Sequence, residues 1–248
     1  MKVCVFVLAS VLMIGSAEGA EKIPARMLEQ EPMELLYTSI EGPSVESVLV
    51  EKESCGSSDS CKDVDVDFDY PIELNSQVQA FINLFTGSRR EFFTASLDRS
   101  SKYVEEFRRI FAKAGIPQDL VYMAHVESAF KVNAYSKAKA KGIFQFIAPT
   151  GRRYGLKINK RVDERSDPTK SAQAAAHYLK DLYKLFGDWH LALAGYNAGE
   201  MKIIRCLTLV QHKNFWSVAK HLKAETRGYV PAIFAATIIA KNPEKYGF

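Results

Sequence analysis

The sequence lacks the usual metal-binding spacings, internal repeats and, after its first 20 residues, any long apolar run. Its five histidines are scattered and no His-Glu-x-x-His pattern occurs, so we expect neither a metal ion nor another cofactor. A membrane-spanning helix needs about 20 apolar residues, and no segment beyond the N-terminus approaches that length. Strand patterns are also sparse. These absences favour a mostly helical fold.

Cysteine is scarce, with four residues in a chain of 248. Cys4 precedes the N-terminal apolar run instead of following it, which argues against a lipid-attachment site. Cys55 and Cys61 flank a small polar loop, where export would allow a disulfide; two separate thiols are the alternative. Cys206 has no evident partner, and we expect it to pack as a small hydrophobic residue.

The first 20 residues have the pattern of a secretory signal. Lys2 supplies a positive charge, residues 3–14 form an apolar run, and small residues at positions 15–20 make a cleavage zone. Because this run is short for a membrane span, we expect the signal to be removed, with retention as an anchor as the alternative. The pattern predicts export to the periplasm or the cell envelope.

Charge divides the rest of the chain near residue 70. Residues 21–70 hold 13 acidic and 4 basic side chains, whereas residues 71–248 hold 15 acidic and 28 basic ones. The acidic stretch has little periodicity and ends in the alternating run 63–69, so we expect a solvated, disordered linker. A cover over the basic domain is the alternative. Residues 71–248 are then the helical domain.

Basic residues gather in one part of that domain: Lys137, Lys139, Lys141, Arg152 and Arg153. Nucleic acid is the first hypothesis for such a cluster. No nucleic-acid motif accompanies it, and an exported chain rarely meets nucleic acid, so we expect no nucleic-acid partner. Attraction to carboxylates of a cell-wall polymer and simple solvation of a loop are the remaining interpretations.

Apolar spacing and helix-breaking residues predict the helices. Residues 231–240 are apolar all round, which is typical of a buried helix, and residues 137–141 are expected to form a loop. The remaining predicted helices cover the segments 78–85, 103–111, 119–129, 169–186 and 189–198.

Glu127 is the candidate general acid. In a helix it would lie four residues after Met123 and seven after Leu120, on an apolar face. Partial burial raises the pKa of a carboxyl group and keeps it protonated near neutral pH, as a general acid for glycosidic cleavage requires. The alternative is a buried glutamate paired with an arginine.

A second catalytic carboxylate is hard to find, although glycosidases commonly use two. Asp119 is expected to start a helix after Pro117, Asp163 and Glu164 to lie in a charged loop, and Glu225 to belong to a later motif. One carboxylate that acts twice therefore fits better.

Four short motifs follow one another in the helical domain: His125–Phe130, Gly142–Phe146, Ala194–Gly199 and Glu225–Val230. In this order they resemble the glutamate-serine, glycine-glutamine, tyrosine-asparagine and glutamate-threonine signatures of the soluble-lytic-transglycosylase family. Ser136, residues 149–156 and the pair Phe215-Trp216 extend the resemblance, which runs from about Tyr70 to near Phe248. It implies a lysozyme-like fold with a catalytic core at about 115–248 and an N-terminal helical extension.

The resemblance implies a peptidoglycan lytic transglycosylase, a lyase that cleaves the β-1,4 bond between N-acetylmuramic acid and N-acetylglucosamine. In that family one glutamic acid acts as acid and then as base, and the product is a 1,6-anhydromuramoyl end. Glu127 would be that residue. Implied substrate-binding residues are Ser128, Gln145, Tyr196, Asn197, Glu225 and Tyr229.

Each of these residues also has a plainer interpretation. Ser128 could bond back to its helix, and Gln145 could cap a loop backbone. Tyr196 and Asn197 could form a helix terminus, and Glu225 could be a helix N-terminal charge favoured by the helix dipole. The chain also departs from the family by having Ile143-Phe144 in place of the usual Leu-Trp or Leu-Met, and Gly195 in place of alanine.

Two rival functions stay open. One is a hydrolase of goose-type lysozyme character on the same fold, and the other is a non-catalytic glycan-binding protein. In every case peptidoglycan glycan strands are the expected partner of a monomer, with peripheral membrane or cell-wall association left open.

Overall fold

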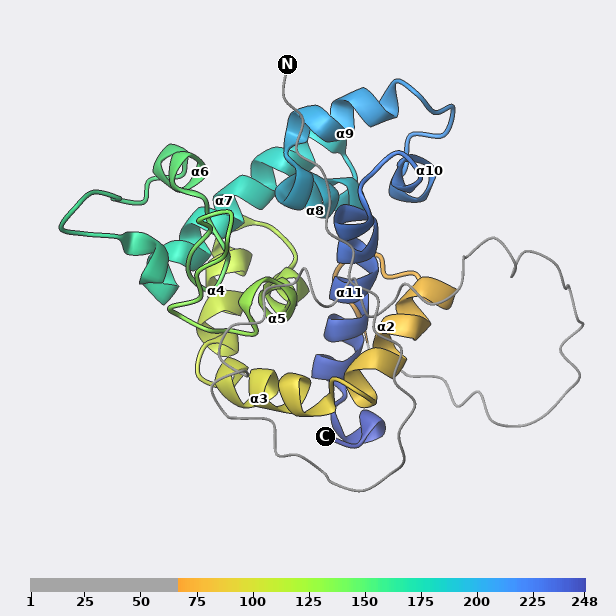
Figure 1. Ribbon diagram of the computed structural model, residues 1–248, viewed down its shortest axis with the longest axis horizontal. Helices are drawn as coiled ribbons and strands as arrows, with labels where there is room; N and C mark the ends of the chain where they lie inside the picture. Colours follow the sequence, from red (N-terminus) through yellow and green to blue (C-terminus); the bar gives the residue numbers. More distant parts are fainter. Residues whose placement is uncertain (1–66) are drawn as a thin grey trace, which may run out of the picture. The chain divides into compact units, whose positions relative to one another are not determined.

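The computed structural model describes residues 67–248, so the expected signal, most of the acidic linker and the Cys55–Cys61 pair lie outside the described residues. The described part is helical, and its β-structure consists of isolated bridges (Figure 1). The α-helices are α2 (Ser76–Thr86), α3 (Arg90–Ser100), α4 (Val104–Ala114), α5 (Met123–Ser128), α6 (Ala148–Arg153), α7 (Pro168–Phe186), α8 (Trp189–Ala198), α9 (Glu200–Leu207), α10 (Phe215–Ala219) and α11 (Ala224–Lys241). Short 3₁₀ helices are η3 (Gln118–Tyr122), η4 (Glu164–Ser166) and η5 (Glu244–Tyr246).

Most helices with a clear apolar spacing are confirmed. In α2 the predicted apolar residues are buried, and the Asn75 side chain caps the N-terminus by accepting from the amide N–H groups of Gln77 and Val78. Helix α4 ends at Gly115, whose φ of +73° suits glycine. Both α7 and α8 lie within a residue of the predicted bounds. Helices α3, α6, α9 and α10 were not predicted, although α9 does place Ile203 and Cys206 on one buried face.

Helix α11 forms the centre of the described domain. It packs against α2, α5 and α8, as Figure 1 shows for the blue helix running between them. Its residues from Tyr229 to Ile239 are buried, which confirms the predicted buried helix. The helix nevertheless begins at Ala224 and continues through Pro231, although proline has no N–H for the carbonyl four residues before it. Burial on every side outweighs that lost bond.

The segment predicted as one helix over 119–129 is a 3₁₀ turn followed by α5. Asp119 lies in the first turn as expected, but its side chain does more than start a helix. It is fully buried and pairs with Arg108 at 2.8 Å and Lys241 at 2.6 Å. Asp119 therefore fastens η3 to α4 and α11.

The packed domain begins before Pro71, the expected end of the linker. Tyr70 is buried, and its hydroxyl lies 3.2 Å from the Thr237 hydroxyl on α11. The Asp69 carboxylate accepts from the amide N–H groups of Gln118 and Asp119. The last residues of the acidic run are thus part of the fold.

Two smaller expectations are also settled. Cys206 is buried in the core, as predicted for a small hydrophobic residue. The loop expected around 137–141 is present and pairs with its surroundings through short β-bridges. Within residues 67–248, no helix combines the length and the apolar character needed to cross a membrane.

Candidate active site

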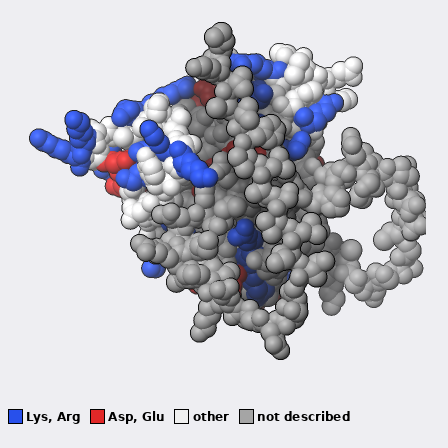
Figure 2. Space-filling model, viewed as in Figure 1, with Lys and Arg blue, Asp and Glu red and all other residues white. Residues whose placement is uncertain are grey.

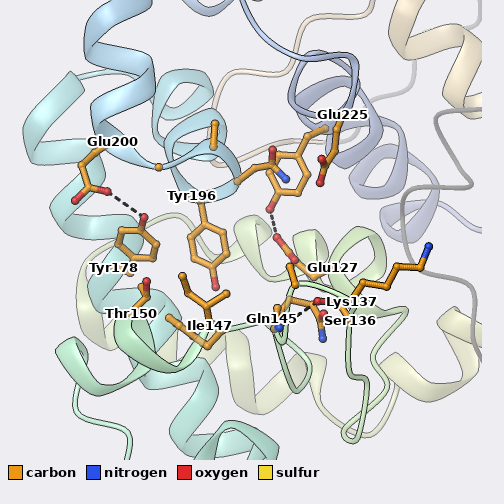
Figure 3. A pocket seen from close by; sticks show the side chains of 17 residues that line it. Glu127, Ser136, Lys137, Gln145, Ile147, Thr150, Tyr178, Tyr196, Glu200 and Glu225 are labelled. Atoms are coloured by element: carbon orange, nitrogen blue, oxygen red, sulfur yellow. Dashed lines mark hydrogen bonds between the residues drawn. The ribbon is translucent and has the colours of Figure 1, made fainter. Parts of the chain in front are cut away.

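A cavity of about 480 Å³ brings together residues from α5, the loop after it, α6, α7, the α8–α9 junction and α11. Figure 3 shows Glu127 and Gln145 on one side of this cavity, with Tyr178 and Glu200 at its far end. Of the site residues expected from the sequence, six line it: Glu127, Gln145, Tyr196, Asn197, Glu225 and Tyr229. The four sequence motifs therefore meet at one place.

Glu127 lies in the last turn of α5 with its carboxyl group in this cavity. Burial raises the pKa of Glu127 to about 8; a hydrogen bond from Tyr229 lowers it, and the nearby charge of Glu225 raises it. Among residues 67–248, no lysine or arginine forms an ion pair with Glu127, so the alternative of an arginine-paired glutamate is not found. The carboxyl group is protonated at neutral pH.

Tyr229 decides which oxygen of Glu127 carries that proton. It is buried on α11, and its hydroxyl donates to Oε1 of Glu127, the bond drawn as a dashed line in Figure 3. Because Oε1 accepts this bond, the acidic proton resides on Oε2. One oxygen is held by the protein and the other is available as a donor.

Helix α5 is short, and neighbouring α3 holds it in place. The Ser96 hydroxyl lies 2.7 Å from Nδ1 of His125, and Arg99 Nε donates to the Ala129 carbonyl at 2.7 Å. Burial lowers the pKa of His125 to about 3, so this histidine is neutral. Ala129 has a φ of +52°, which turns the chain sharply just after Glu127. Contacts from α3 thus fix the end of the helix that carries the acid.

Gln145 lies at the cavity and also bonds within its own loop, as its plainer interpretation expected. It lines the cavity, and its Nε2 also donates to the Gly142 carbonyl at 2.8 Å within its own loop. Gly142 is required there, because its φ is +85° and a Cβ would lie 1.8 Å from the Arg165 carbonyl oxygen. The tight turn therefore presents Gln145 to the cavity in a fixed position.

Tyr196 and Asn197 lie in the last turn of α8, so the helix-terminus interpretation holds together with the cavity one. The Tyr196 hydroxyl donates to the Phe144 carbonyl at 2.8 Å, and burial raises its pKa well above the ordinary value. Oδ1 of Asn197 accepts from the Thr226 hydroxyl at 2.7 Å. These bonds tie α8 to the glycine-glutamine loop and to α11.

Ser128 and Glu225 differ in outcome. Ser128 does not line the cavity, and its hydroxyl donates to the Ile143 carbonyl at 2.8 Å, so it bonds neither its own helix nor the cleft. It holds the glycine-glutamine loop against α5. Glu225 is an exposed residue in the first turn of α11, as the dipole interpretation expected, and it also lines the cavity.

Sequence reasoning missed the far end of the cavity. Tyr178 on α7 donates to Glu200 Oε2 at 3.4 Å, as Figure 3 shows. Arg153 Nη1 donates to Glu200 Oε1 at 3.0 Å. Tyr178 is hidden in the apolar pattern of a long helix. Glu200, however, follows the tyrosine-asparagine motif directly, and that position was a usable signal.

The basic cluster is divided between several roles. Lys141 pairs with Asp163 at 3.1 Å, which confirms the charged loop, and Arg153 pairs with Glu200. Lys137 lines the cavity. On the face seen in Figure 2, lysine and arginine side chains gather along the edge where α6 and its neighbouring loops lie in Figure 1.

Comparison with known proteins finds a family model and relatives that resemble part of this chain. Residues 107–219 match the model of the Transglycosylase SLT domain family. Over 140 residues the chain is 41% identical to "Membrane-bound lytic murein transglycosylase D" of Escherichia coli strain K12, a match covering 54% of this chain and 30% of that protein. These matches confirm the resemblance expected from the four motifs.

Two further relatives complete the comparison. A protein of Alteromonas sp. strain M-1 named for tributyltin chloride resistance is 32% identical over 102 residues, which cover 41% of this chain and 49% of that protein. The crystal structure of the 70 kDa soluble lytic transglycosylase SLT70 of Escherichia coli aligns with a TM-score of 0.51 and 23% identity, covering 57% of this chain and 24% of that one. This likeness confirms the fold, which is mostly helical and lysozyme-like. The chain spans less than a third of the Escherichia coli D protein and about half of the Alteromonas protein.

Proposed function

We propose that this chain, whose residues 107–219 match the model of the Transglycosylase SLT domain family, is a peptidoglycan lytic transglycosylase. The observation that carries the proposal is Glu127, a carboxyl group whose pKa is raised to about 8 in a cavity lined by polar side chains. Such a group can donate a proton at neutral pH and accept one afterwards. The murein in the name of the Escherichia coli relative supports peptidoglycan as the substrate.

The reaction needs one proton donor that becomes a proton acceptor. Oε2 of Glu127 gives its proton to the glycosidic oxygen as the bond from that oxygen to the anomeric carbon of N-acetylmuramic acid breaks. The resulting carboxylate removes the proton of the sugar's 6-hydroxyl, whose oxygen bonds to the anomeric carbon. Glu127 is protonated again, no water is consumed, and the product has a 1,6-anhydro end.

Neighbouring groups support each half of this cycle. The Tyr229 hydroxyl donates to Glu127 and therefore stabilises the carboxylate between the two steps. The acetamido group of the substrate can assist at the anomeric carbon, as in other single-carboxylate glycosidases. Gln145, Tyr196 and Asn197 surround the space where an N-acetylated sugar would lie.

A hydrolase is the second candidate, and Glu225 is the observation that favours it. This exposed carboxylate lines the same cavity as Glu127 and could position a water molecule, as the second carboxylate of ordinary glycosidases does. Glu225 acts on the pKa of Glu127 through its charge alone, because no hydrogen bond joins Glu225 to Glu127 within the described residues. The single-carboxylate cycle therefore has the better support.

Digestion of purified peptidoglycan sacculi, followed by mass analysis of the products, distinguishes these functions. A lytic transglycosylase yields anhydro-ended fragments, each lighter by one water than a lysozyme fragment. Reducing-end muramic acid in fresh digests would assign a hydrolase. Retention on sacculi without soluble product would assign a binding protein.

The proposal includes export, removal of the N-terminal signal, and action as a monomer on glycan strands in the periplasm or cell envelope. The N-terminal pattern and the envelope relatives support this location. N-terminal sequencing of the exported protein is expected to find a start between about residues 18 and 21. A start at Met1 would assign a retained anchor.

A further inference from the structure

A second cleft, of about 380 Å³, lies away from Glu127. It is formed by the extended residues 69–73, the turn between α7 and α8, and the start of α10. Helix α8 connects the two places, since it begins at Trp189 in this cleft and ends at Ala198 in the catalytic cavity. Its ten residues separate them by about 15 Å. The two clefts are distinct.

Aromatic rings form much of the wall. Trp189 stacks on Tyr183 with ring centroids 4.1 Å apart and an angle of 15° between the rings. Tyr183 is 38% exposed, so part of this stacked pair faces solvent. Trp216 lines the cleft as well, and its ring packs edge-on against His190. Both tryptophans of the chain therefore lie in this one cleft.

The charged groups in the lining are all acidic. Asp69, Glu73 and Asp188 line the cleft, and no lysine or arginine does. The Asp69 carboxylate accepts from two backbone N–H groups, and Asp188 caps α8 by accepting from the Leu191 N–H. Within residues 67–248, none of these three carboxylates pairs with a lysine or arginine. A domain rich in basic residues thus has a cleft whose carboxylates are held by backbone N–H groups or lie beside His190, without a lysine or arginine partner in the described part.

His190 lies between the Pro71 carbonyl and Glu73. Its Nε2 lies 2.8 Å from the Pro71 carbonyl, which can only accept, so Nε2 carries the ring proton. Nδ1 then has no proton for Glu73, whose Oε1 lies 3.7 Å away. The Glu73 side chain is 54% exposed and free to meet a ligand.

We propose that this cleft binds an organic cation, a primary ammonium group carried on an aliphatic stem. Carboxylates and the faces of tryptophan and tyrosine both attract an ammonium ion, and an aliphatic stem packs on the rings. A metal ion fits less well, because no group of three or more acidic, histidine or cysteine side chains among the described residues is arranged to hold one. The size of the cleft is at the lower end of the range for small ligands.

The tryptophans make the test direct, because all tryptophan fluorescence of the chain arises in this cleft. The full chain is titrated with N-acetyl-lysine methylamide, with N-acetyl-norleucine methylamide as the matched probe that keeps an aliphatic stem and lacks the ammonium. We expect a saturable fluorescence change with the first probe, weakened by salt, and none with the second. A chitooligosaccharide is titrated in parallel. Two results would overturn the proposal. One is an equal fluorescence change with the norleucine and lysine probes, and the other is a change with the chitooligosaccharide but with neither amino-acid probe.

Two variants locate the binding. Glu73→Gln should weaken binding of the lysine probe by up to about fivefold, as expected for one partly exposed charge. Tyr183→Leu removes one ring of the stacked pair and should also weaken it. Glu91→Gln, an exposed acidic residue outside the cleft, is the matched control and should bind like the parent. Equal binding by all three variants would overturn the assignment.

A free diamine such as cadaverine then identifies the source of the ammonium. Tighter binding of the lysine derivative assigns an amine carried by a peptide, and tighter binding of the diamine assigns a small polyamine. These titrations need no turnover. Ammonium binding can therefore be absent while the anhydro products of the proposed function are found, and ammonium binding can be present while those products are absent.

Discussion

The region around Asp119 and the region around Glu127 each hold a carboxyl group away from open solvent, a fully buried one at Asp119 and a half-buried one at Glu127, with different partners. Both lie on the short segment from η3 to α5. Asp119 is paired with Arg108 and Lys241 and serves to hold three elements together. Among the described residues, Glu127 has only the Tyr229 hydroxyl as a partner, and desolvation keeps it protonated. Burial alone therefore does not identify a catalytic carboxyl group, whereas burial without a cation does point to one.

Glu127→Gln should show the largest effect. General acid–base groups contribute about 10²–10⁴-fold, and here one group serves two steps, so turnover should fall by about 10⁴-fold or more. The fold should persist, because glutamine is nearly the same size and still accepts from Tyr229. Anhydro-product formation and the melting temperature are measured together. A fully active variant would remove Glu127 from the mechanism.

Asp119→Asn should show the reverse pattern. Removing one partner of a buried ion pair typically costs about 3–5 kcal/mol, because Arg108 and Lys241 lose their shared anion. Denaturant unfolding measures this loss, while activity per folded molecule should stay near that of the parent. Loss of activity in a fully stable Asp119→Asn protein would instead give Asp119 a catalytic role. Asp119 and Glu127 would then no longer differ as a structural and a catalytic carboxyl group.

Tyr229→Phe should sharpen the comparison by leaving Glu127 with no partner. The hydrogen bond from Tyr229 lowers the pKa of Glu127, so its loss should raise that pKa further. The carboxylate formed between the two steps also loses a donor, which is worth about 1.5–3 kcal/mol, or roughly 10–100-fold in rate. The alkaline limb of the pH–rate profile should therefore move to higher pH. A profile identical to the parent's would mean that Tyr229 does not act on the acid.

The pH dependence of stability should also report on the burial of Glu127. Because the pKa of Glu127 is raised from 4.5 to about 8, the carboxyl group stays protonated in the folded state while it ionises in the unfolded state. Its contribution to stability is complete below pH 4.5 and decreases as the pH rises to about 8. Relative to Glu127→Gln, the parent should therefore lose stability over this window, and its activity should fall above about pH 8. A pH-independent difference in stability between the two proteins would show that Glu127 is not buried as described.

Apolar spacing was sufficient for the long helices, because a helix that packs on a core buries every third or fourth residue. Apolar spacing predicted the bounds of α7 and α8 to within one residue, and it predicted the buried part of α11. It failed for α3 and α6, whose apolar spacing is weak. Helix α3 nonetheless supplies Ser96 and Arg99, the residues that hold the end of α5.

The sequence by itself determined the helical class and the four motifs, and it made Glu127 the candidate acid, because these depend on residue types at short spacings. Only the tertiary structure decided the state of that residue. The Tyr229 hydroxyl comes from 102 residues away, and burial of the carboxyl group depends on how α11 packs on α5. Packing likewise turned Ser128 toward the Ile143 carbonyl and gave Asp119 two cations. Charge and hydrogen bonding are set by distance in space, which residue spacing along the chain does not fix.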